Sequence, residues 1–274
     1  MHPHLLRAAG GFPHGHSVVT RAGEPVADTG IDFGVLRLSR GEEYLDDPSR
    51  ETALLLLDGS VELAVDGAVF RAERSSLFDQ DPSAVHHAAG TMCCVRALSA
   101  CELVVVSTRS SGLFPPAFFD ASSMVETEHR DRDLLDGTSH RIVRTVFDGR
   151  NRPDAGLVLG EVVTLPGRWS SYPPHHHPQP EIYHYRFDHP SGFGFCQLGE
   201  DVVTVRQGDT VKILDMNDHA QVAAPGYAMF YVWVIRHLPG QPYRTPEFSP
   251  EHAWLKDPAV RVWRPCGNED GARR

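Results

Sequence analysis

Three histidines and one glutamate in the second half of the chain have the spacing of a metal site. His175, His177 and Glu181 stand in an H-x-H-x3-E arrangement. Residues two apart on an extended chain face the same side, so both imidazoles can reach one ion, and the residues before Glu181 allow a turn. His219, in a turn before another apolar segment, is the best candidate for a fourth ligand. The pattern predicts one bound divalent metal ion.

The ligand types narrow the metal only partly. Nitrogen and oxygen ligands without thiolate suit several divalent metals, so Zn or Mn is expected, with Fe and Ni as alternatives. Adjacent histidines after Pro173-Pro174 could instead form a solvated loop, but the spaced Glu181 and His219 favour the metal site. By parity His176 is expected outside the metal shell. His184 and His189 are expected on the surface or in packing.

The rest of the chain has the pattern of an all-β protein. Short runs rich in Val, Leu, Phe and Tyr alternate with Asp-Gly and Gly-Asp turn pairs, and long amphipathic helices are not evident. Ala88-Ala89-Gly90 precedes one apolar strand, as Ala224-Pro225-Gly226 precedes another. This weak internal repeat predicts two similar lobes.

Composition and the repeat divide the chain into five predicted parts. They are an N-terminal arm (1–29), an N-terminal lobe (30–111), a crossing segment rich in Pro, Ser and charge (112–138), a C-terminal lobe with the metal site (139–264) and a tail (265–274). Aligning the repeat on Gly90 and Gly226 places Ser83 opposite His219. The N-terminal lobe has His86-His87 but no H-x-H followed by an acid, so we expect it to be metal-free.

Charge and cysteine content exclude several classes of protein. The 26 basic and 36 acidic residues give a net charge of −10, and no basic run could follow a phosphate backbone, so nucleic acid is not an expected partner. The five cysteines form no CxxC pair, which argues against a disulfide framework or a thiolate zinc site. No signal peptide or run of about 18 apolar residues is present, so we expect a cytoplasmic protein without membrane contact.

Motifs beyond the histidines resemble a known family. H-x-H-x3-E followed by His219 is similar to the two metal motifs of the cupin superfamily, whose fold is a double-stranded β-helix or jelly roll. More narrowly, the chain resembles the bicupin 5-deoxy-glucuronate isomerases of myo-inositol catabolism in GRWSSYPPHHH, EIYHYRF, GFGF, VAAPGY, PEHAWL and, in the first lobe, SLFDQDPSAVHHAAG. The resemblance runs from about residue 30 to about residue 260 and implies two cupin lobes in one chain.

The resemblance implies an aldose–ketose isomerase that converts 5-deoxy-glucuronate to 5-dehydro-2-deoxy-gluconate through an enediolate. The metal would act as a Lewis acid, and the catalytic candidates are Glu181, Tyr183 and Tyr231, with Glu181 or Tyr231 as the general base. Parity from Glu181 puts Tyr183 and Tyr185 on the cavity side of their strand, with Ile182 and His184 away from it. Aromatic filling of the interior is the competing interpretation of these tyrosines.

The substrate carboxylate requires a cation or a set of amides. Lys212, one of two lysines, is the first candidate, and Arg168 is the alternative with bidentate geometry. Either could be an ordinary surface charge. Further contacts with substrate are expected from Tyr172, beside Ser171 near the cavity mouth, from Tyr185 and from Gln197.

Two other functions compete with the isomerase. An Fe(II)-dependent cupin dioxygenase would use the same histidines and glutamate, and a non-catalytic bicupin would bind a sugar acid without chemistry. A small-molecule sugar acid is the expected partner in the first and third cases. Pairing of edge strands would give a homodimer, an expectation that rests on the fold alone.

Overall fold

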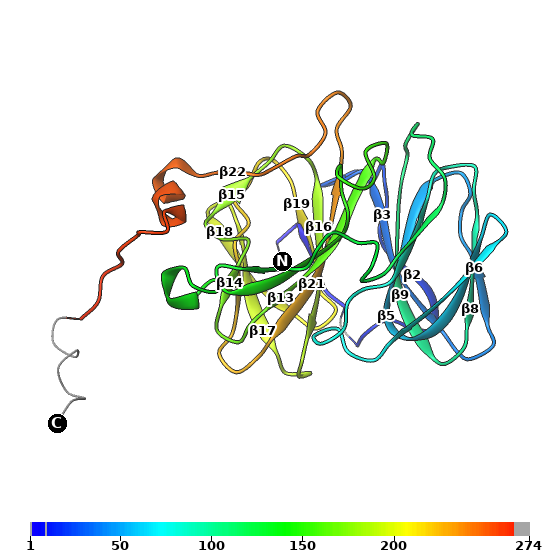
Figure 1. Cartoon of the computed structure of the whole chain (residues 1–274), viewed down its shortest axis with the longest axis horizontal. Helices are drawn as coiled ribbons and strands as arrows, with labels where there is room; N and C mark the ends of the chain where they lie inside the picture. Colours follow the sequence, from blue (N-terminus) through cyan, green and yellow to red (C-terminus); the bar gives the residue numbers. More distant parts are fainter. Residues whose placement is uncertain (1, 9, 266–274) are drawn as a thin grey trace.

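Two lobes of antiparallel sheet lie side by side in the structure, a computed structural model that describes residues 2–8 and 10–265 (Figure 1). Helix within these residues is limited to two 3-10 segments, η1 (Leu135–Gly137) and η2 (Pro250–Lys256). The all-β prediction is therefore confirmed. The predicted tail lies outside the described residues apart from Pro265. No helix in the described part of the chain is long and apolar enough to cross a membrane.

The N-terminal lobe is a single nine-stranded sheet that folds over its own core. Its long central strand, β5 (Glu51–Val65), pairs through its first half with β7 and β9 and through its second half with β6 and β8. The register shifts between Leu56 and Asp58, where the strand passes from one half to the other. The remaining strands are β2 (Gly15–Thr20), β3 (Ile31–Leu38), β4 (Glu43–Leu45), β6 (Ala68–Arg74), β7 (Ala84–His87), β8 (Cys93–Ala97), β9 (Cys101–Thr108) and β10 (Ala117–Phe119).

The C-terminal lobe packs a seven-stranded sheet on a four-stranded sheet. The larger sheet has the order β1 (Leu5–Leu6), β19 (Thr210–Ile213), β16 (Glu181–Phe187), β21 (Met229–Arg236), β13 (Leu157–Thr164), β12 (Arg141–Phe147) and β11 (Glu128–Arg130). The smaller sheet has the order β14 (Trp169–Ser170), β20 (Gln221–Ala223), β17 (Phe193–Leu198) and β18 (Asp201–Arg206). A separate two-stranded sheet joins β15 (His175–His176) to β22 (Glu247–Phe248).

Segments outside the two predicted lobes also contribute strands. Within the predicted arm, β1 joins the large C-terminal sheet and β2 joins the N-terminal sheet. Within the predicted crossing segment, β10 pairs with β7 and β11 pairs with β12. The arm and the crossing segment therefore each contribute one strand to either lobe and so link the two lobes.

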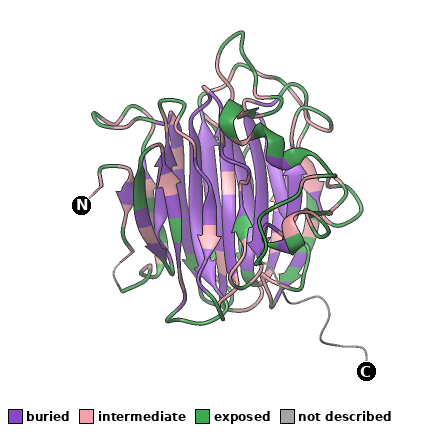
Figure 2. Ribbon diagram, turned by 90° about the vertical axis from the view of Figure 1, so that its left-hand side faces the viewer, coloured by how far each residue is buried: buried purple, intermediate pink, exposed green. Residues whose placement is uncertain are grey.

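Alternation along the central strands separates two apolar cores. On β16, Ile182 joins the core between the lobes, whereas Tyr183 and Tyr185 join the core inside the C-terminal lobe. On β21, Phe230 and Tyr231 divide in the same way. Successive side chains of a strand point to opposite faces, so sheets covered on both sides must be almost wholly apolar. In Figure 2 the strands across the middle of the molecule are accordingly buried along most of their length.

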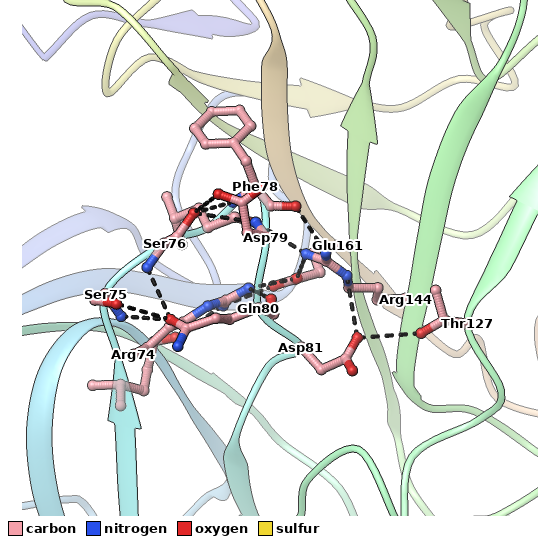
Figure 3. A network of polar contacts seen from close by, with 12 residues as sticks. Arg74, Ser75, Ser76, Phe78, Asp79, Gln80, Asp81, Thr127, Arg144 and Glu161 are labelled. Atoms are coloured by element: carbon pink, nitrogen blue, oxygen red, sulfur yellow. Dashed lines mark hydrogen bonds and ion pairs between the residues drawn. The ribbon is translucent and has the colours of Figure 1, made fainter.

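A buried charge network fastens the N-terminal lobe to the C-terminal one (Figure 3). Glu161 on β13 accepts hydrogen bonds from Arg74 (2.6 and 2.9 Å) and from Arg144 (3.0 Å). Arg144 also donates to the carbonyls of Leu77 and Phe78, both at 2.9 Å. The three charged side chains are almost completely buried, so each needs the ion pairs of this network. The network therefore holds the two lobes in one relative position.

Candidate metal centre

Three separate elements deliver the predicted metal ligands to one end of the C-terminal lobe. Glu181 begins β16 and lies opposite Ile213 of β19 on one side and Ile235 of β21 on the other. His175 lies in the short strand β15, and His219 precedes β20. Only the fold brings His219 to residues some forty positions earlier in the chain.

His177, Glu181 and His219 form a buried cluster whose ligand atoms all lie within 4.8 Å of one another. The Oε2 atom of Glu181 lies 3.2 Å from Nε2 of His177 and 3.5 Å from Nε2 of His219. The three side chains are at most 3% exposed. Two imidazoles and one carboxylate around a common point match the donor set of a divalent transition metal.

Hydrogen bonds to backbone carbonyls orient the rings of His177 and His219. Nδ1–H of His177 donates to the carbonyl of Gln179, and Nδ1–H of His219 donates to the carbonyl of Asn217, both at 2.9 Å. Each Nε2 then faces Oε2 of Glu181. Burial lowers the pKa of His219, which keeps this ring in the neutral form that metals bind. The residues therefore fit a metal ion.

His175 and His176 differ as parity predicts. His175 lies beside the cluster, its ring centroid 4.8 Å from that of His219, and its Nδ1–H donates to the carbonyl of Pro173. Burial, and then the neighbouring His219, lower its pKa well below 6.5. His176 instead binds Asp218 through Nδ1 at 2.9 Å. Its place outside the cluster agrees with the prediction, whereas ligation by His175 stays a prediction.

The other two histidines were expected on the surface or in packing. His184 is completely buried between the lobes, where its ring lies against Phe33 and Nδ1 contacts the hydroxyl of Thr210. His189 is exposed. Neither belongs to the metal cluster.

The cluster lies in the wall of a cavity of about 720 Å³. Ser171, Tyr183 and Tyr231 also line this cavity, and Ser171 Oγ lies 2.9 Å from the Tyr183 hydroxyl and 3.3 Å from the Tyr231 hydroxyl. Tyr231 donates in turn to Ser170 Oγ at 3.1 Å. The backbone of Ser171 has a left-handed φ of 47°, a conformation that is unfavourable for serine and is often found at functional sites.

Burial decides the protonation of the cavity phenols. It raises the pKa of Tyr231 to about 12 and that of Tyr183 well above 10. At neutral pH Tyr231 therefore keeps its proton, a state that favours Glu181 over Tyr231 as the general base.

The structure places four of the expected substrate contacts away from the lining of the cavity. Lys212 is opposite Ile182 in the register and donates to Glu24 at 2.6 Å, on the face of the sheet away from the cavity. Arg168 does not line the cavity. Tyr185 donates to Gln221 inside the lobe, and Gln197 donates to the carbonyl of Gly199. Tyr172 does line the cavity, as predicted.

Several residues that line the cavity were not predicted from the sequence. The cations of the wall are arginines from four segments: Arg130, Arg141, Arg150 and Arg244. Trp233 adds an indole that lies over Gly160, where a Cβ atom would come within 2.4 Å of the ring. Parity from Tyr231 could have identified Trp233, whereas the arginines depend on the tertiary fold.

Sequence comparison matches the chain to the KduI/IolB family over residues 4–255. A 5-deoxy-glucuronate isomerase of Lacticaseibacillus casei is 26% identical over 260 residues, which cover 87% of this chain and 92% of that protein.

Solved structures show the same fold. An IolB-like protein from Salmonella typhimurium LT2 superposes with a TM-score of 0.77 at 22% identity, over 89% of this chain and 99% of that one. Oxalate decarboxylase of Lactobacillus farciminis gives a TM-score of 0.64 at 12% identity, over 88% and 87% of the two chains. These likenesses confirm the prediction of two cupin lobes in one chain.

Proposed function

Because the chain belongs to the KduI/IolB family, we propose that it is a metal-dependent aldose–ketose isomerase of myo-inositol breakdown. The proposed reaction converts 5-deoxy-glucuronate to 5-dehydro-2-deoxy-gluconate. The observation that carries the proposal is the convergence of His177, Glu181 and His219 beside a row of hydroxyl groups in one cavity. The name of the L. casei relative supports the choice of substrate.

We assign the metal to His177, Glu181 and His219, with His175 as the fourth ligand. The carbonyl partners of the Nδ1 atoms hold the rings so that the Nε2 atoms face inward. A divalent ion held there, Zn or Mn on the donor set, would supply Lewis-acid stabilisation of negative charge on the substrate oxygens.

The protein's own groups would move the protons. Oε2 of Glu181 faces the histidines, and no hydrogen bond to Oε1 is found among the described residues. We assign to Oε1 the transfer of a proton between the two adjacent carbons of the substrate. The hydroxyls of Ser171 and Tyr183 would donate to the substrate oxygens. Tyr231, which keeps its proton at neutral pH and donates it to Ser170, would hold Ser171 in place through the contact between their hydroxyls.

Two measurements on the purified protein test this function. Elemental analysis should find about one divalent metal per chain, and an anaerobic assay should show loss of the aldehyde of 5-deoxy-glucuronate with formation of the ketone. Chelation should abolish the conversion, and Zn or Mn should restore it.

Other outcomes select the competing functions. Oxygen uptake with turnover on a bound iron would identify a dioxygenase. A metal-loaded protein that binds 5-deoxy-glucuronate without converting it would be the non-catalytic bicupin. A protein without metal would contradict the site itself.

A further inference from the structure

A segment near the C-terminal end of the described chain roofs the metal cavity. This segment, residues 241–248, is called the strap. Its first residue accepts a hydrogen bond from Gln179 Nε2 to the Gln241 carbonyl at 2.9 Å. At its other end β22 pairs with β15, so that Phe248 lies opposite His175 (Figure 1). Both ends are thus fixed to the loop that carries the metal-binding histidines.

Five consecutive strap residues, 242–246, line the cavity. The ring of Tyr243 lies 4.9 Å from the ring of His177, and its backbone N–H donates to Nδ1 of His237. Pro242 and Pro246 form the two ends of this stretch, and the ring of each fixes its own backbone φ angle. The position of the next residue, Arg244, is therefore set by contacts on both sides.

Charge pairing distinguishes Arg244 from the other three arginines of the cavity. Arg130 pairs with Glu128 at 2.9 Å, Arg150 pairs with Asp148 at 2.8 Å, and Arg141 pairs with Asp131. Arg244 has no ion pair or side-chain hydrogen bond to any other described residue, and it is exposed. Among the described residues, Arg244 is therefore the cavity arginine without a carboxylate partner, and its whole donor fork is available to a ligand.

We propose that Arg244 binds the carboxylate of the sugar-acid substrate, an inference that rests on the proposed function of the cavity. A guanidinium presents a planar pair of donors that matches the two oxygens of a carboxylate. Substrate held at its carbonyl end by the metal centre and at its acid end by the strap would have one orientation. This assignment replaces Lys212 and Arg168, and it predicts selection of uronic acids over neutral aldoses of the same length.

Three strap variants test the proposal in the metal-loaded protein. Arg244→Gln should raise KM for 5-deoxy-glucuronate about 10- to 100-fold, the range expected for loss of one charge-assisted contact, with a smaller change in kcat. Arg244→Lys should recover part of the loss. Glu247→Gln removes an exposed charge from the same strap outside the cavity, and its KM should match that of the wild type.

A neutral analogue separates substrate recognition from a merely structural role. With 5-deoxy-glucose, which carries a hydroxymethyl group in place of the carboxylate, wild type and Arg244→Gln should have equal kcat/KM. A similar loss on both compounds, or a KM change below threefold on the acid, would overturn the role of Arg244.

Titration calorimetry makes the test independent of turnover. If wild type binds 5-deoxy-glucuronate without converting it, and Arg244→Gln weakens only the binding of the acid, the isomerase proposal fails and the carboxylate site stands. If the wild type binds the acid no better than 5-deoxy-glucose, the carboxylate site is wrong, whatever the activity.

Discussion

Both lobes bury histidines beside carboxylates, but the two arrangements differ in what the ring nitrogens contact. In the N-terminal lobe, His86 contacts Glu51 through Nε2 at 3.0 Å and receives a hydrogen bond from Arg152 at Nδ1. His87 contacts Asp46 through Nε2 at 2.5 Å and the carbonyl of Ala88 through Nδ1. Every ring nitrogen there has a partner of its own.

In the C-terminal lobe, each histidine of the cluster uses only Nδ1 for a carbonyl. The Nε2 atoms of His177 and His219 share one carboxylate oxygen, at 3.2 and 3.5 Å. A metal ion needs several lone pairs directed at one point, which separate His–carboxylate pairs cannot offer. Residue type and burial are therefore common to both lobes, and only the cluster in the C-terminal lobe brings two imidazoles and a carboxylate to one point, where they could hold a metal ion.

The contrast predicts the largest effect for removal of a C-terminal histidine. His177→Ala should lose the metal and reduce isomerisation at least about 10³-fold, because the ligand set and the Lewis acid are lost together. The matched change in the N-terminal lobe, His87→Ala, should keep the metal but lose stability, since Asp46 is left buried without its partner. Metal analysis, activity assays and circular dichroism of both variants test this difference between the lobes. Equal metal loss in both variants would contradict it.

The network between the lobes should give the next largest effect. Glu161→Gln leaves Arg74 buried without a counter-charge and leaves Arg144 with only the half-exposed Asp81, which should lower the free energy of unfolding by about 3–5 kcal/mol. Glu62→Gln, which removes the partner of the mostly exposed Arg71, should change it by less than about 0.5 kcal/mol. Urea titration measures both, and similar values for the two variants would show that the lobes do not depend on this network.

Acid should weaken the N-terminal lobe through His86. Burial lowers the pKa of His86 to about 4, whereas the unfolded chain binds this proton near pH 6.5. Stability should therefore fall as the pH drops from about 6.5 to 4, by about 3 kcal/mol from this residue. His87, whose pKa Asp46 raises against the opposing effect of burial, acts in the opposite direction and loses its contribution as the pH rises.

The variant His86→Gln isolates the contribution of His86 to the pH dependence of stability. It should be less stable than the wild type at pH 7.5, yet lose less stability between pH 7.5 and pH 4.5. Urea titrations at the two pH values, with metal removed from both proteins, provide the measurement. An unchanged pH slope would mean that His86 does not stay neutral in the fold.

The smallest effect concerns a single hydroxyl. Tyr231→Phe should lower kcat about 10- to 100-fold with metal content unchanged, because the hydroxyl that holds Ser171 toward the substrate oxygens is lost. Tyr44→Phe, which removes a phenol from the N-terminal lobe, should leave kcat unaltered. Steady-state kinetics of both variants decide whether hydroxyl chemistry is confined to the C-terminal lobe.

Strand parity and local motifs were sufficient to predict much of this protein. The all-β fold followed from short apolar runs between turn pairs, and the H-x-H-x3-E motif identified His177 and Glu181, two of the three residues of the cluster. Parity also predicted the inward side chains of Tyr183 and Tyr185 and the outward one of Ile182. The strand positions and the facing of their side chains depend only on residues that are adjacent in sequence, and these residues stay adjacent in any fold.

Tertiary structure alone decided the rest. Lys212 has the charge that a carboxylate needs, but the register of β19 turns it to the other face of the sheet, toward Glu24. Arg244 enters the cavity because β22 pairs with β15. The histidines of the two lobes differ through partners that lie dozens of residues away. Such contacts depend on which strands pair and in what register, and no local pattern encodes that choice.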